Sequence, residues 1–140
     1  GCVASAIDYS PDMVALARAR NRAACGEGRL EVLEADAGAL PFPDGTFTSA
    51  ASTNAFFFFA RPDAVLREAH RVLAPGGRLV IFTVAPNPPG WMAPPPIARR
   101  MSFYSDHELR AMLERAGFAG AHVEAADHRG YSLLATAHRP

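Results

Sequence analysis

Short apolar segments alternate with helix-forming segments along most of this 140-residue chain. The segments predicted to form strands are residues 3–7, 30–33, 46–53, 78–84, 121–125 and 131–137. Strands that alternate with helices pair mostly in parallel, and the helices cover both faces of the sheet. Only five residues separate the last two segments, so these two form an antiparallel hairpin. The pattern predicts an α/β fold with a doubly wound, mostly parallel sheet and one antiparallel strand from the C-terminal hairpin.

The first predicted helix follows the first strand. Ser10 and Pro11 suit the N-cap and the first position of a helix, and Gly26 and Gly28 suit its end. The spacing of apolar side chains predicts that one face of this helix is buried. That face consists of Met13, Leu16, Ala17 and Ala24.

Two more helices have clear signals. The first of these helices begins at Pro62, and Pro75, Gly76 and Gly77 are expected to end it. The second begins with a capping box that Ser105 forms with Glu108. The first has an apolar stripe of Val65, Leu66, Ala69, Val72 and Leu73, and the second one of Leu109, Met112, Leu113 and Ala116. His70 points away from its stripe, so we expect it to be solvated.

Composition and charge exclude several classes of partner. The 14 basic and 14 acidic side chains are scattered, which argues against a nucleic-acid partner. A hydrophobic content of 49% suits one compact domain over residues 1–140, and no apolar run is long enough to span a membrane. Cys2 and Cys25 have neither metal-ligand nor disulfide spacing, so we expect no metal and a reducing, cytoplasmic location.

Acidic side chains follow the first two predicted strands. The carboxyl ends of parallel strands form the ligand-binding edge of such a sheet, where a carboxylate can accept both ribose hydroxyls of a nucleoside. Asp8 has this position after the first strand, and Tyr9 beside it can pack on an adenine ring. Asp36 recurs after the second strand. The alternatives are an ordinary strand-end carboxylate for Asp8 and a turn-forming side chain for Asp36.

Four segments together resemble the class I S-adenosylmethionine-dependent methyltransferases that act on small molecules. They are residues 6–13, 34–44, 71–79 and 104–118, which occur in the order typical of that family and extend over nearly the whole chain. The resemblance implies a Rossmann-like fold, S-adenosylmethionine as the cofactor, and transfer of its methyl group to a small-molecule acceptor.

The resemblance also implies roles for individual residues. It makes Asp36 the acceptor for the adenine amino group, with the Ala37 amide beside it, and it places Asn54 next to the methionine part of the cofactor. The motif over residues 71–78 has a mainly structural meaning. No catalytic residue is identified, because many members of the family align cofactor and acceptor without a dedicated base.

The chain begins at Gly1, almost directly before a predicted strand. The first strand and the glycine loop of the family are absent before it, so we expect an N-terminally truncated domain. The glycine loop should approach the cofactor closely. We therefore expect the 140 residues alone to bind S-adenosylmethionine poorly and to methylate nothing.

Two apolar segments remain to be interpreted. Residues 86–104 form a proline-rich loop, in a place where enzymes of this family often build a cap over the substrate. Residues 56–59 are four consecutive phenylalanines, and packing under a loop is a better explanation for them than a substrate wall. None of the five histidines is expected to be a general base.

Two other functions stay open. Asp8 can equally hold the ribose of NAD in an oxidoreductase, and a non-catalytic Rossmann-like binding domain can share the fold without the activity. The loop at residues 40–44, the Pro-Gly-Gly turn and the C-terminal hairpin favour a methyltransferase. The order of the strands discriminates: in a methyltransferase the last strand lies antiparallel between the two strands that precede it in the chain.

Overall fold

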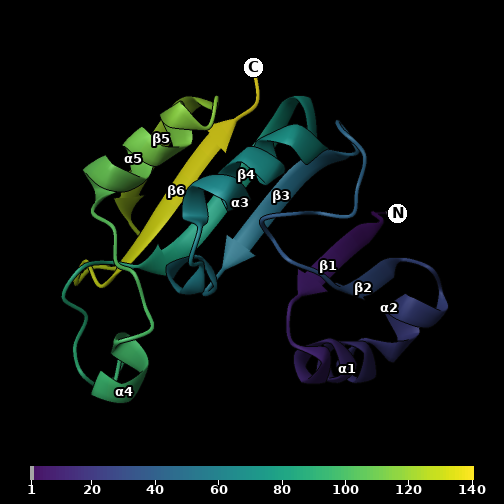
Figure 1. Ribbon diagram of the computed structural model, residues 1–140, viewed down its shortest axis with the longest axis horizontal. Helices are drawn as coiled ribbons and strands as arrows, with labels where there is room; N and C mark the ends of the chain where they lie inside the picture. Colours follow the sequence, from purple (N-terminus) through teal and green to yellow (C-terminus); the bar gives the residue numbers. More distant parts are fainter. Residues whose placement is uncertain (1) are drawn as a thin grey trace. The chain divides into compact units, whose positions relative to one another are not determined.

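The computed structural model describes residues 2–140, which divide into two compact units, the first extending to Pro41 and the second consisting of Phe42–Pro140. The elements of the first unit are β1 (Ala4–Asp8), α1 (Pro11–Arg20), α2 (Arg22–Gly26) and β2 (Leu30–Glu34) (Figure 1). Those of the second unit are β3 (Phe47–Thr53), the 3-10 turn η1 (Phe56–Phe58), α3 (Pro62–Val72), β4 (Leu73–Val84), α4 (Pro95–Ala98), α5 (Asp106–Arg115), β5 (Ala119–Ala125) and β6 (Ser132–His138).

The first unit is a parallel strand pair with two helices. β1 and β2 pair in register from Ala4 opposite Leu30 to Asp8 opposite Glu34, which confirms the predicted parallel pairing. The connection between the strands is not one helix, because the chain leaves helical geometry at Asn21, between α1 and α2.

The predicted buried face of α1 is wrong for Met13 and Leu16, whereas Ala17 and Ala24 are half-buried. Met13 and Leu16 are 49% and 40% exposed, whereas Val14 is only 4% exposed. The guanidinium of Arg18 donates to the carbonyl oxygen of Val32 on β2. Because Val14 lies one turn before Arg18 on the same side of α1, this bond directs both residues toward the strands. The sequence pattern missed this face because a charged side chain, Arg18, lies on it.

The second unit contains a four-stranded sheet in the order β3-β4-β6-β5. β3 and β4 are parallel, as predicted, and β6 is antiparallel to both of its neighbours, β4 and β5. In Figure 1 the yellow β6 accordingly lies between β4 and β5. The last strand of the chain is therefore inserted between the two strands that precede it.

β4 begins earlier than predicted. Helix α3 ends at Val72 and not at the Pro-Gly-Gly sequence, because Leu73 already pairs with Phe47 of β3. The register then shifts so that the next partners are Ser49 and Arg78, and residues 74–77 form a bulge. Gly77 is required there, since a Cβ atom at this position would lie 2.7 Å from the carbonyl oxygen of Ala74.

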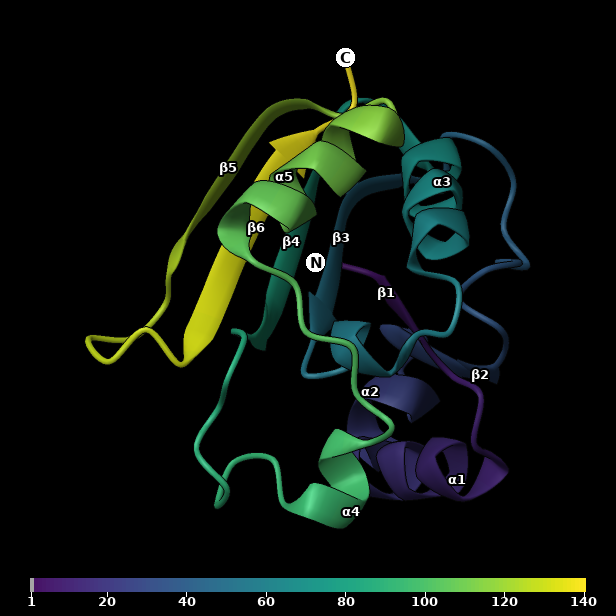
Figure 2. The same ribbon diagram turned by 60° about the vertical axis from the view of Figure 1, so that its left-hand side comes forward.

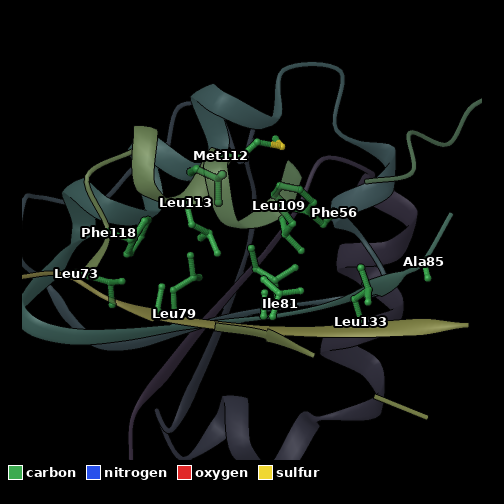
Figure 3. Packing of buried hydrophobic residues seen from close by; sticks show 14 residues of the cluster. Phe56, Leu73, Leu79, Ile81, Ala85, Leu109, Met112, Leu113, Phe118 and Leu133 are labelled. Atoms are coloured by element: carbon green, nitrogen blue, oxygen red, sulfur yellow. The ribbon is translucent and has the colours of Figure 1, made fainter. Parts of the chain in front are cut away.

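Helices α3 and α5 pack on one face of this sheet, which Figure 2 shows from the side of α5. In Figure 3, Leu109 and Leu113 of α5 point toward Leu79 and Ile81 of β4, and Met112 lies beside them on the same helix. The predicted stripe of α5 is confirmed for these three residues, which are 0–5% exposed, and that of α3 for its buried members. Those members are Leu66 and Val72, together with Leu73 at the helix end. The predicted capping box is also present, with both of its hydrogen bonds.

His70 is not solvated, contrary to the prediction. Its ring packs edge-on against Phe118, with 5.1 Å between the ring centroids, and its Nε2 atom is buried. A Cβ atom at Gly117 would lie only 3.1 Å from that nitrogen, so the turn after α5 closes directly over the imidazole. Burial, and next the positive charge of Arg139, lower the pKa of His70 below its ordinary value of 6.5.

This lowered pKa makes stability depend on pH. The unfolded chain takes up a proton on His70 as the pH falls through about 6.5, whereas the folded chain does so only at a lower pH, so protonation favours unfolding. We expect the melting temperature to fall as the pH decreases from about 7.5 to about 5, and we expect His70→Phe to reduce this fall. His128→Gln, which changes an exposed histidine in a turn, is the control. Equal pH dependence in His70→Phe and in the wild type would contradict this account.

Candidate functional site

Asp8 and Asp36 lie at the same edge of the first unit. Asp8 is the last residue of β1 and pairs with Glu34, the last residue of β2, and Asp36 follows two residues later. The amide of Ala35 donates to the carbonyl oxygen of Asp8 at 3.0 Å, which continues the pairing of the two chains beyond the strands. The structure thus brings together the two carboxylates that the sequence indicated, at the carboxyl end of a parallel pair.

Both carboxylates make the same local turn. Oδ1 of Asp8 accepts from the amide of Ser10 at 2.8 Å, and Oδ1 of Asp36 accepts from the amide of Gly38 at 2.8 Å. The turn-forming alternative for Asp36 therefore describes its contact with Gly38 correctly, and Asp8 forms a turn of the same kind with Ser10. Such a bond fixes the orientation of a carboxylate, because one of its oxygens is held by the backbone.

The second oxygen of Asp8 is available for another contact. Within the part of the chain that the structure describes, Oδ2 of Asp8 has no hydrogen-bond partner. The side chain is partly buried, and it lies two positions before Ser10, whose hydroxyl accepts from the Met13 amide and caps α1. An oriented carboxylate with one open oxygen is suited to accept hydrogen bonds from hydroxyl groups.

The neighbours of these carboxylates differ in exposure. The Tyr9 ring is 81% exposed, so its face is accessible to a planar ligand. Ala37 is half-buried inside the turn that Asp36 forms with Gly38.

Asn54 belongs to the second unit, at the carboxyl end of β3. Its amide donates to the carbonyl oxygen of Phe82 at 3.1 Å, and its side chain is exposed. It has φ of 53°, a left-handed conformation that asparagine tolerates better than most residues. The backbone therefore turns sharply at the end of the strand, immediately before the phenylalanine segment.

The four phenylalanines are mainly a packing element. Phe56 is fully buried and Phe57 is 6% exposed, which confirms the packing interpretation for these two residues. Phe56 contacts the rings of Phe59 and Tyr104 edge-on, with 5.8 Å between centroids in each pair. Phe58 is the exception, since it is 48% exposed.

The proline-rich segment 86–104 contains α4 and exposes large apolar side chains. Trp91 is 71% exposed and Ile97 is 47% exposed. The Trp91 ring meets the Tyr131 ring edge-on at a centroid distance of 6.5 Å. The amide of Ser102 donates to the carbonyl oxygen of Phe57 at 2.7 Å, which ties the end of this segment to the phenylalanine segment.

Among residues 2–140, no group of three or more metal-ligating side chains occurs, and none of the helices is long and apolar enough to cross a membrane. The cysteines Cys2 and Cys25 are both free. Arg71 belongs to the motif for which the sequence indicated a structural meaning, and its guanidinium reaches the loop at Phe42 and Asp44.

The sequence matches the family described as methyltransferase domain over residues 1–81, which is more than half of the chain. The demethylmenaquinone methyltransferase of Thermus thermophilus is 48% identical over 83 residues, which are 59% of this chain and 37% of that protein. The chain thus spans little more than a third of the length of this relative.

Two solved structures show the same fold at low sequence identity. An S-adenosylmethionine-dependent methyltransferase from Thermotoga maritima has a TM-score of 0.80 and 21% identity, with 97% of this chain and 72% of that chain covered. The [4+2]-cyclase SpnF has a TM-score of 0.80 and 20% identity, with coverages of 99% and 67%. The second protein is named for a different reaction, so the fold alone does not decide the chemistry.

The turn at Asp8 leads to a prediction on stability. Asp8→Ala removes the acceptor of the Ser10 amide, and we expect it to lower the free energy of unfolding by about 1 kcal/mol. Asp8→Asn should leave this energy nearly unchanged, because the amide oxygen of asparagine can accept the same bond. Urea unfolding of both variants measures the difference. An equal loss in the two variants would show that the charge, and not the turn, is what stabilises this region.

Proposed function

This chain belongs to the methyltransferase domain family, and we propose that the protein transfers the methyl group of S-adenosylmethionine to a small-molecule acceptor. The observation that carries this proposal is the strand order, with antiparallel β6 between β4 and β5. That order is the one expected for methyltransferases. We treat residues 1–140 as one methyltransferase-like domain, since the family match begins in the first unit and continues into the second.

The proposed cofactor contacts are Asp8, Tyr9, Asp36, Ala37 and Asn54. The open Oδ2 atom of Asp8 fits a pair of ribose hydroxyls, because a carboxylate oxygen accepts and a hydroxyl donates. The exposed ring of Tyr9 fits the adenine face. Asp36 and the Ala37 amide would hold the adenine edge, and Asn54 would lie near the methionine part.

The chemistry requires little from the protein beyond alignment. When bound, the cofactor supplies a methyl group that is already activated by the sulfonium. The protein must hold the accepting atom in line with the methyl carbon and the sulfur, and it must exclude water. We assign no general base. His70, a histidine close to this family's sequence motif, is buried against Phe118 and has a lowered pKa, so it serves packing.

The acceptor is proposed to be a small organic molecule. The relative from Thermus thermophilus is named for demethylmenaquinone, which supports an acceptor of this size class. We propose that segment 86–104 covers the acceptor, since it exposes Trp91 and Ile97 although most apolar side chains of the second unit are buried or half-buried. We further propose a cytoplasmic location and no nucleic-acid partner, in line with the balanced charge.

Two other functions compete with methyl transfer. A nicotinamide-dependent oxidoreductase would also use a carboxylate at the position of Asp8, but antiparallel β6 between β4 and β5 is not expected in it. A Rossmann-like domain without methyl transfer is the stronger rival, because SpnF shares the fold under the name of a cyclase. Measurements of cofactor binding distinguish a methyltransferase from the first alternative, and a methyl-transfer assay distinguishes it from the second.

Asp8→Asn tests the cofactor site in the full-length protein. The variant retains the turn but presents an amide NH₂ where the carboxylate had a free oxygen, so the ribose hydroxyls lose a charged acceptor. We expect the affinity for S-adenosylhomocysteine, measured by calorimetry, to fall about ten- to a hundredfold. Glu31→Gln, an equal charge change at an exposed position on β2, should bind like the wild type. Unchanged affinity in Asp8→Asn would remove Asp8 from the site, and tighter binding of NADH than of S-adenosylhomocysteine by the wild type would favour the oxidoreductase.

A further inference from the structure

The exposed apolar side chains of the second unit are concentrated in two segments. Phe58 of η1 is 48% exposed, and Trp91 and Ile97 of segment 86–104 are 71% and 47% exposed. Elsewhere among residues 42–140, the large apolar side chains are buried or half-buried. The exposure is therefore a local property of these two segments, and large exposed apolar side chains that occur together indicate a contact surface.

Backbone and ring contacts hold the two segments in place. The amide of Ser102 donates to the carbonyl oxygen of Phe57 at 2.7 Å, and the rings of Phe57 and Phe58 meet edge-on with 4.6 Å between centroids. The amide of Arg100 donates to the carbonyl oxygen of Ile97 at 2.8 Å, which closes a turn after α4. In Figures 1 and 2, α4 lies at the outer end of its segment, beyond the end of β4 from which the segment starts.

The charged side chains of segment 86–104 are all positive. Arg99 and Arg100 directly follow α4 and are exposed, and the segment contains no aspartate or glutamate. Among the residues that the structure describes, neither guanidinium has a hydrogen-bond or ion-pair partner. The first carboxylates after the segment are Asp106 and Glu108 of α5, and Glu108 is engaged in the capping box. The segment therefore carries two uncompensated positive charges beside its exposed apolar side chains.

This combination of side chains suits the boundary between water and a lipid bilayer. Apolar side chains gain free energy when they leave water for the acyl region, and tryptophan is favoured at the boundary because its indole N–H can stay in contact with water. Arginine side chains are attracted by the phosphate groups of anionic lipids. Such a surface binds peripherally and requires no helix that crosses the membrane.

We propose that segment 86–104, together with Phe58, is a contact surface for an anionic phospholipid membrane. Trp91 and Ile97 enter the headgroup region, and Arg99 and Arg100 contact the lipid phosphates. The positive charge of the segment is what assigns the surface to an anionic bilayer. The consequence for the acceptor rests on the function proposed above: a segment that contacts lipid and covers the acceptor receives an acceptor that is dissolved in the membrane.

Co-sedimentation of the full-length protein with vesicles, in the absence of cofactor, tests this surface. The vesicles consist of phosphatidylcholine with about 30% phosphatidylglycerol, or of phosphatidylcholine alone. We expect Trp91→Ser combined with Ile97→Ser to lower the partition coefficient on the anionic vesicles at least about tenfold. Arg99→Gln combined with Arg100→Gln should lower it about ten- to thirtyfold on the anionic vesicles and change it little on phosphatidylcholine.

Two matched controls alter similar side chains elsewhere. Leu16→Ser changes an apolar side chain of α1 that is 40% exposed, and Arg110→Gln combined with Arg129→Gln removes two exposed arginines of the second unit. Both should bind the anionic vesicles within about twofold of the wild type. Trp91 packs against Tyr131, so if its replacement prevents folding, Ile97→Ser and the variant of Arg99 and Arg100 still test the surface.

The possible outcomes separate this surface from other occupants and from the proposed reaction. A wild-type protein that does not co-sediment with anionic vesicles, or folded variants of the segment that bind like the wild type, would overturn the lipid contact. A dimer in sedimentation velocity that Trp91→Ser with Ile97→Ser converts to monomers would assign the surface to a second copy of the chain instead. Vesicle binding by a protein that transfers no methyl group from S-adenosylmethionine would retain the surface and overturn the proposed function.

Discussion

The second unit depends on β4, which is hydrogen-bonded along both of its edges. β3 pairs with it in parallel and β6 pairs with it in the antiparallel direction. Its side chains Leu79 and Ile81 are buried under α3 and α5, so the same strand joins the sheet to the core. A buried amide or carbonyl without a partner costs about 1–3 kcal/mol, and loss of this strand would leave two rows of them. The pairing of β4 with β6 also produces the strand order on which the functional assignment rests.

The C-terminal end of α3 is a second point on which distant segments converge. The last carbonyl groups of a helix have no partner inside it. Here Nη1 of Arg139, near the end of the chain, donates to the carbonyl oxygens of His70, Arg71 and Leu73. The positive charge of Arg139 also suits the negative end of the helix dipole. Since Arg71 at the same helix end holds the loop at Phe42, helix, loop and chain end are stabilised together.

The sequence predicted those parts of the candidate site that depend on contacts between residues close together in the chain. Asp8 and Asp36 follow parallel strands, and the side-chain turns that orient them involve residues only two positions away. The contacts of Arg71 were not predictable, because its acceptors at Phe42 and Asp44 are brought to it only by the folding of the sheet. The environment of His70 was missed for the same reason: its neighbour Phe118 comes from the turn after α5.

The sequence by itself determined the strands, the three main helical segments and their order. Ser10 and Ser105 begin helices through bonds to amides three residues on, and the hairpin of β5 and β6 follows from a short connection. Only the tertiary structure decided at which residue α3 ends and β4 begins, which face of α1 is buried and which groups surround His70. The physical reason is that caps and turns are completed within a few residues, whereas burial and strand pairing require partners that only the folded chain brings into contact.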